Sequence, residues 1–143
     1  MMRRDEGEIS MSMRILVVDD HLEARRTLRT FITAQRKDWQ VCAEASDGAE
    51  AVEQVKALHP DVVVLDLAMG GLNGAAAAEQ ISCESPNTIV LTTSLYDARP
   101  LFPRLLNGGV RGFIPKSRLG IDLIPAIEAA RKGKTWFKPS DKH

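Results

Sequence analysis

Short apolar segments alternate with amphipathic segments along most of this chain. Five apolar runs rich in β-branched residues predict strands, at 13–18, 39–43, 61–65, 88–91 and 110–114. Their starts lie roughly 22 to 27 residues apart, which leaves room for one helix between consecutive strands. Three of the runs are continuously apolar, as expected of strands that are covered on both faces. The pattern therefore predicts five β-α units.

The segments between the runs have helical periodicity. The predicted helices are centred on 24–32, 48–58, 74–82, 97–106 and 122–132. In the first, the apolar residues share one face, and three arginines are expected to point away from it: Arg25, Arg26 and Arg29. Proline fits a helix best in its first turn, so we predict that position for Pro100, Pro103 and Pro125. Gly133 is the expected stop of the last helix.

Five such units with right-handed crossovers form a doubly wound, parallel, five-stranded α/β sheet in three layers, the flavodoxin-like (βα)5 architecture. We predict that this single domain occupies residues 13–133. Residues 1–12 are predicted to be a disordered lead-in, and 134–143 a tail or a truncated linker. Ligands of such sheets bind at the carboxyl ends of the strands.

Composition narrows the possible functions. The chain has 19 Lys and Arg against 19 Asp and Glu, and this zero net charge argues against direct nucleic-acid binding. The apolar runs are far shorter than a membrane span, and residues 1–12 lack the apolar core of a signal peptide. Two cysteines, Cys42 and Cys83, are too few for a disulfide scaffold. We therefore expect a cytoplasmic protein.

Polar residues gather where the predicted strands end. Asp19 and Asp20 follow the first run, Asp66 the third, Thr92 the fourth and Lys116 the fifth. Taken alone, an aspartate at a strand end is usually a helix cap. Together, carboxylates about 4 Å apart repel by about 4 kcal/mol per pair at an effective dielectric near 20. This cost predicts a bound cation, and an all-oxygen ligand set suits Mg²⁺ or Mn²⁺.

Lys116 and the Thr92 hydroxyl would add hydrogen-bond donors to the same rim. Carboxylates, cation, ammonium and hydroxyl together suit phosphoryl transfer, in which charge spreads over three oxygens. Asp66, from a central strand and expected at an exposed rim, is the candidate nucleophile. His21 and His59 are interpreted as solvent-facing residues at helix ends.

Four motifs at these positions resemble the receiver domain of bacterial two-component response regulators. They are LVVDD at 16–20, VLDLAMGGLNG at 64–74, VLTT at 90–93 and GFIPKS at 112–117. The resemblance extends from about residue 13 to 133. The segments around Thr92 and Lys116 are similar to receivers that precede LuxR-type helix-turn-helix outputs.

The resemblance implies a role for each site residue. Asp66 would accept a phosphoryl group from the phosphohistidine of a sensor kinase or phosphotransfer protein. Asp20 and Asp66 would ligate Mg²⁺ through their side chains, Ala68 through its backbone carbonyl and Asp19 through water. Lys116 would pair with a phosphoryl oxygen. Self-catalysed transfer to Asp66 and slow autodephosphorylation would follow.

The resemblance also implies a conformational switch. Thr92 would move toward the acyl phosphate, and Phe113 would change its rotamer on the face formed by the fourth helix, fifth strand and fifth helix. That face would bind a downstream protein or a second copy of the chain. The chain departs from the family at Gly70 and Ser117, where proline is common, and in the two prolines that open the fourth helix. Phe113 also lacks the hydroxyl of a tyrosine.

Other functions remain as alternatives. A phosphatase of the haloacid-dehalogenase type needs a second acid two residues after the nucleophile, where this chain has Ala68 after Asp66 and His21 after Asp19. A nucleotide or flavin module would need a glycine-rich first turn in place of the acidic pair. A degenerate receiver could act only as a docking module. The chain could equally be a free-standing receiver or the receiver fragment of a LuxR-type transcriptional regulator.

Overall fold

The computed structural model describes residues 12–69 and 73–138. Its strands are β1 (Met13–Val18), β2 (Trp39–Ala45), β3 (Val62–Asp66), β4 (Ile89–Ser94) and β5 (Gly112–Pro115). Its α-helices are α1 (Leu22–Gln35), α2 (Gly48–Leu58), α3 (Gly74–Glu84), α4 (Phe102–Asn107) and α5 (Leu119–Arg131). Short 3₁₀ turns precede α4 and α5, at Arg99–Leu101 and Lys116–Arg118. The predicted disorder of the lead-in at residues 1–11 and the departure at Gly70 lie outside the described residues.

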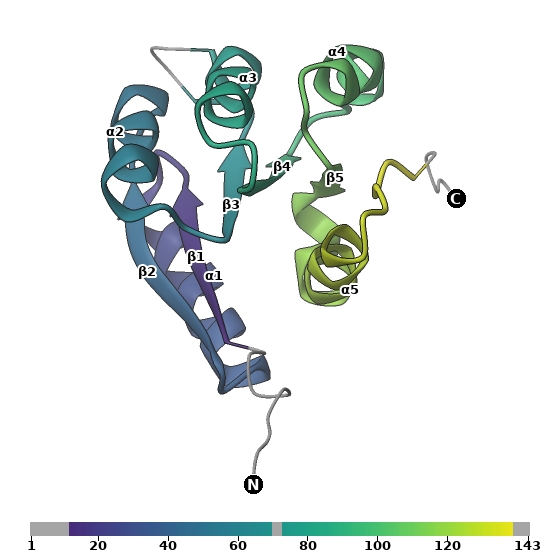
Figure 1. The fold of residues 1–143 in the computed structure, drawn as a ribbon. Coiled ribbons are helices and arrows are strands. Elements are labelled where there is room, and N and C mark those ends of the chain that lie inside the picture. The colour runs from purple at the N-terminus through teal and green to yellow at the C-terminus, as the bar shows by residue number, and fades with distance from the viewer. Residues whose placement is uncertain (1–11, 70–72, 139–143) are drawn as a thin grey trace, which may run out of the picture.

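All five strands are parallel and form one sheet in the order β2-β1-β3-β4-β5. The order reverses direction at β1, so the chain winds first along one half of the sheet and then along the other (Figure 1). The predicted doubly wound architecture is confirmed. β4 and β5 each extend further toward their carboxyl ends than the apolar runs indicated, because threonine, serine and proline continue the ladder there.

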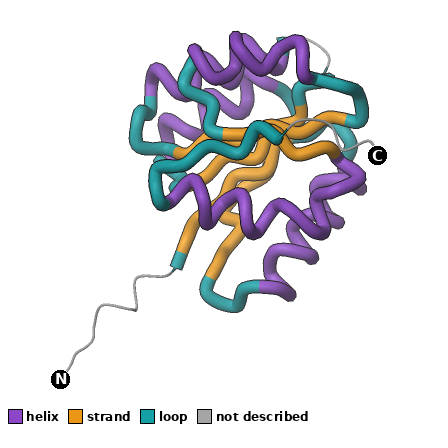
Figure 2. The backbone as a smooth tube through the Cα atoms, turned by 90° about the vertical axis from the view of Figure 1, so that its right-hand side faces the viewer, coloured by secondary structure: helices purple, strands orange, loops and turns teal. Residues whose placement is uncertain are grey.

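The sheet is covered on both faces, which gives three layers (Figures 1 and 2). Leu16 and Leu65 face a core built with α2, α3 and α4, whereas their neighbours Ile15 and Val64 face a core built with α1 and α5. Each of these four side chains is at most 1% exposed. Burial on alternating faces explains why the strands are continuously apolar.

The prolines divide into two groups. Pro100 lies in the first turn of the 3₁₀ helix and Pro103 in the first turn of α4, as predicted. Pro125 lies inside α5, so its predicted place in a first turn was wrong. The helix begins at Leu119, three residues earlier than the pattern indicated, because it continues directly from the turn that carries Lys116.

Two of the arginines that were predicted to point away from the apolar face of α1 pair with the sheet. Arg25 Nε donates to Glu44 Oε1 at 3.0 Å, and Arg29 Nε donates to Glu44 Oε2 at 2.7 Å. Glu44, on the edge strand β2, thus ties α1 to the sheet. Periodicity identified the apolar face correctly but could not identify a charged partner on another element.

Within the described residues, no helix is long and apolar enough to cross a membrane.

Candidate functional site

Asp19 is fixed at the carboxyl end of β1 by its own backbone. Its N–H donates to the Ala45 carbonyl at 3.1 Å, and its carbonyl accepts from Arg25 Nη1 at 2.8 Å. Its carboxylate is nearly buried, and Oδ1 accepts the backbone N–H of His21 at 2.9 Å. The second carboxylate oxygen, Oδ2, faces the end of β5.

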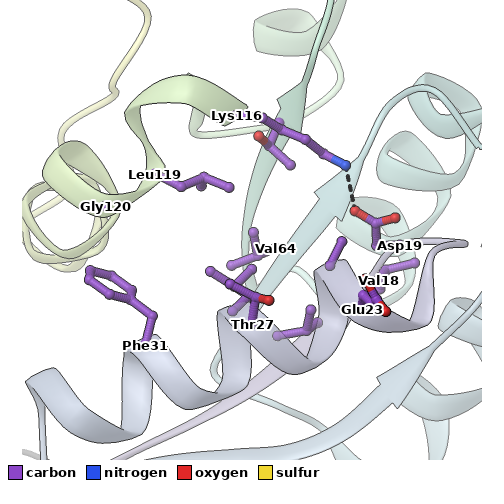
Figure 3. Close-up of a pocket in the computed structure, with 13 residues that line it drawn as sticks. Val18, Asp19, Glu23, Thr27, Phe31, Val64, Lys116, Leu119 and Gly120 are labelled. Atoms are coloured by element: carbon purple, nitrogen blue, oxygen red, sulfur yellow. Dashed lines mark hydrogen bonds and ion pairs between the residues drawn. The ribbon is translucent and has the colours of Figure 1, made fainter.

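Lys116 joins Asp19 to Asp66. Its Nζ donates to Asp19 Oδ2 at 2.6 Å and to Asp66 Oδ2 at 3.2 Å, the first of which is drawn in Figure 3. Asp66 is the last residue of β3, and its Oδ1 accepts the backbone N–H of Ala68 at 3.0 Å. Asp66 is only 2% exposed, so the expectation of an exposed rim was wrong for this residue. The structure thus brings together three residues that lie 47 or more positions apart in sequence.

The ion pair between Lys116 and Asp19 shifts the pKa of both groups. Burial acts to raise the pKa of Asp19, but the hydrogen bonds from Lys116 and from the His21 backbone outweigh it, so the pKa lies below its usual value. Burial acts to lower the pKa of Lys116, but the hydrogen bond to Asp19 and the charge of Asp66 leave it above its usual value. Lys116 and Asp19 are therefore both charged at neutral pH.

Asp20 lies on the open side of this group. Its side chain is 37% exposed, and its Oδ1 is 3.0 Å from His21 Nδ1, which is also 3.3 Å from Asp19 Oδ1. One potential ligand atom from each of these three residues lies within 4.8 Å of the others. The two carboxylates fit a hard divalent cation, whereas an imidazole is a poorer ligand for Mg²⁺. His21, interpreted from sequence only as a helix-end residue, is a close neighbour of the candidate metal ligands.

Thr92 and Phe113 are neighbours in the β4–β5 register. Thr92 is fully buried, and its hydroxyl donates to the Gly112 carbonyl at 2.9 Å. Phe113 is 6% exposed, and its ring centroid lies 5.6 Å from that of Phe102 on α4. The predicted switch residues are therefore packed together, with the threonine hydroxyl bound to β5.

A cavity of about 400 Å³ opens beside the Lys116–Asp19 pair, between α1 and α5 (Figure 3). Apolar side chains such as Val64, Phe31 and Leu119 form most of its wall. Thr93 also lines it, and the buried Thr93 hydroxyl has no hydrogen-bond partner among the described residues. The sequence pattern gave no signal for Thr93, because only the strand register shows which threonine of the pair faces α1 and α5.

Comparison with known proteins agrees with this geometry. The family model of the response regulator receiver domain matches residues 15–128. The chain belongs to this family. The transcriptional regulatory protein LiaR of Bacillus subtilis is 37% identical over 123 residues, which is 85% of this chain and 57% of LiaR. The receiver-domain chain thus spans about half the length of the curated relatives it matches.

Solved structures show the same domain. A LuxR-family two-component response regulator from Aurantimonas superposes with a TM-score of 0.82 at 30% identity, covering 90% of this chain and 91% of that one. The receiver domain of the putative response regulator NarL from Mycobacterium tuberculosis gives a TM-score of 0.77 at 32% identity, covering 86% and 98%. Receiver domains of this family generally bind Mg²⁺ at their acidic pocket and interact with histidine kinases or phosphotransfer proteins.

Proposed function

We propose that this receiver domain accepts a phosphoryl group on Asp66. The observation that supports this most directly is the position of Asp66, buried at the end of β3 with Lys116 Nζ 3.2 Å from its Oδ2. A carboxylate oxygen of Asp66 would attack the phosphorus of a phosphohistidine. The new P–O bond forms as the P–N bond breaks, and the imidazole leaves with the electron pair and takes up a proton.

The carboxylates of Asp19, Asp20 and Asp66 suggest how negative charge would be balanced during phosphoryl transfer. Asp20 and Asp66 would hold Mg²⁺ directly, Ala68 would contribute its carbonyl, and Asp19 would act through water; Mn²⁺ would fit the same oxygen ligands. The bound cation would neutralise charge on the phosphoryl oxygens. Lys116 would keep its bond to Asp19 while a phosphoryl oxygen replaces Asp66 Oδ2 as its second acceptor.

The output would begin at Thr92. Its hydroxyl would leave the Gly112 carbonyl and donate to the phosphoryl group, and Phe113 would follow on the α4-β5-α5 face. This is a shift between two packed states, driven by hydrogen bonds that exist in only one of them. A downstream protein or a second copy of the chain would bind the altered face.

The wider setting is also part of the proposal. We place the receiver in a two-component or phosphorelay signalling system in the cytoplasm, where a sensor kinase or phosphotransfer protein donates the phosphoryl group. Cys42 and Cys83 are free thiols, as a reducing compartment allows. In the setting of a longer regulator, the domain would control a LuxR-type output.

Intact-mass spectrometry after incubation with acetyl phosphate and Mg²⁺ tests the nucleophile. We expect the mass of one phosphoryl group on the wild-type chain and none on Asp66→Asn. Asp97→Asn, which changes an exposed aspartate that pairs with Arg99, is the matched control and should label normally. Labelling of Asp66→Asn would mean that the nucleophile is misassigned. Lack of labelling in the wild type would favour a degenerate receiver that acts only by docking.

A second variant tests the cation. Asp20→Asn should slow labelling, and raising the Mg²⁺ concentration should restore part of the rate, because one charged ligand has been lost. An unchanged rate at limiting Mg²⁺ would remove Asp20 from the ligand set.

A further inference from the structure

Residues 134–138, which we call the return segment, run back along the outer edge of the sheet after α5 (Figure 1). The Trp136 N–H donates to the Arg111 carbonyl at 2.8 Å, and the Phe113 N–H donates to the Trp136 carbonyl at 2.9 Å. These bonds make a parallel bridge between Trp136 and Gly112. The return segment therefore covers part of the edge of β5 that would otherwise expose unpaired backbone groups.

Two aromatic side chains of the return segment pack on opposite faces of the sheet. Trp136 packs against the core shared with α1 and α5, and Phe137 packs against the core on the α4 side. The Phe137 ring centroid is 5.0 Å from that of Phe102, which in turn contacts Phe113. Three rings thus connect the switch residue of β5 to the return segment.

Gly112 contacts both the return segment and Thr92. A Cβ at Gly112 would lie 2.9 Å from Trp136 Cβ and 3.0 Å from the Trp136 carbonyl, so the two backbones approach as closely as only glycine allows. On its other side, the Gly112 carbonyl accepts the Thr92 hydroxyl. One residue is therefore bound by the switch threonine and packed against the return segment.

We propose that the return segment is a strap that is docked on β5 in the unphosphorylated receiver and released by phosphorylation. This inference rests on the proposed function. When the Thr92 hydroxyl turns to the phosphoryl group, it leaves a space beside β5. Close-packed interiors do not keep such a space, and Phe113, its register neighbour, is placed to fill it. Phe113 then leaves Phe102, so the three rings are no longer in contact, and the return segment leaves the edge of β5.

Amide hydrogen exchange followed by NMR tests the strap. With acetyl phosphate and Mg²⁺, we expect exchange at the Trp136 and Phe113 amides to accelerate about tenfold, with amides of the central strand β1 unchanged. Intact mass is measured on the same sample. A full phosphoryl mass gain with unchanged or slower exchange at these two amides would overturn the strap and leave the proposed function standing. Absence of the mass gain would overturn the proposed function, and with it the proposal that phosphorylation releases the strap.

A variant gives the reciprocal test. Phe137→Ala weakens docking without touching the acidic site, so exchange at Trp136 should rise without phosphorylation. Linkage between two equilibria is reciprocal, so the same variant should bind beryllofluoride with Mg²⁺ more tightly. The gain in affinity should equal the factor by which beryllofluoride increases the equilibrium constant for strap release. Lys134→Ala, which alters an exposed side chain of the return segment, is the control and should change neither quantity. Faster exchange in Phe137→Ala without tighter beryllofluoride binding would show a merely structural segment and refute the coupling.

Discussion

Replacing Lys116 by alanine should destabilise the receiver because two buried carboxylates lose their shared cation. At distances of 2.6 Å and 3.2 Å, the ammonium attracts Asp19 and Asp66 with gross energies of about 6 and 5 kcal/mol at an effective dielectric near 20. Desolvation of the three groups offsets most of this attraction. Breaking a buried pair typically costs about 3 to 5 kcal/mol. Since the Lys116 side chain is 16% exposed, we expect the lower end, about 3 kcal/mol.

Urea unfolding measures this loss directly. At neutral pH with EDTA, Lys116→Ala should lower the transition midpoint without changing the slope, because the same surface is exposed on unfolding. Lys37→Ala, which removes an exposed lysine from the turn before β2, is the control and should unfold like the wild type. A loss below about 1 kcal/mol would show that Lys116 holds neither acid in solution, since surface pairs contribute no more than that.

Mg²⁺ adds a second test of the same reasoning. A cation bound by the acids replaces part of the lost positive charge, so saturating Mg²⁺ should stabilise Lys116→Ala more than the wild type. We expect the difference between the two proteins to shrink by about half. If the deficit stays the same at every Mg²⁺ concentration, the cation does not bind beside these carboxylates.

Three further predictions concern other parts of the chain. Burial acts to raise the pKa of Glu44, but the hydrogen bonds from Arg29 and Arg25 outweigh it and hold this pKa below its usual value. The stabilising contribution of Glu44 is therefore present at neutral pH and is lost as the pH falls through the lowered pKa. Glu44→Gln should cost about 1 kcal/mol at pH 7 and flatten the acid side of a plot of urea midpoint against pH, and an unchanged slope would contradict this. Gly74→Ala should cost about 2 kcal/mol in urea unfolding, because its Cβ would lie 2.6 Å from the Leu67 backbone. A Cβ at Gly120 would have nothing within 4 Å, so Gly120→Ala should stabilise α5 by about 0.5 to 1 kcal/mol. Equal effects of the two glycine variants would refute the packing argument. Ala68 is exposed beside Asp66 and leaves room for an attacking water, so Ala68→Arg should lengthen the half-life of the phosphorylated protein several-fold; a half-life no longer than that of the wild type would count against that access.

The order of elements and the residues at the strand ends were readable from the sequence. Continuously apolar runs at regular spacing can be covered only by helices on both faces, so the three-layer sheet followed from periodicity alone. The carboxyl ends of parallel strands share one edge, and this geometry predicted that Asp19, Asp66 and Lys116 would meet. The ends of the helices were predicted less accurately than the strands. Pro125 was assigned to a first turn because the sequence did not show that a 3₁₀ turn continues directly into α5.

Contacts between distant elements were decided only by tertiary structure. Which of two adjacent threonines bonds to Gly112 depends on strand register, and a shift of one residue would exchange their faces. Burial of Asp66 depends on the elements packed around the end of β3. The ion pairs of Glu44 and the return segment on β5 join residues more than ten positions apart, and no local pattern of apolar and polar residues records such a pairing. Local sequence fixes the direction in which each side chain leaves its own strand or helix, whereas its partner is fixed only when the layers close.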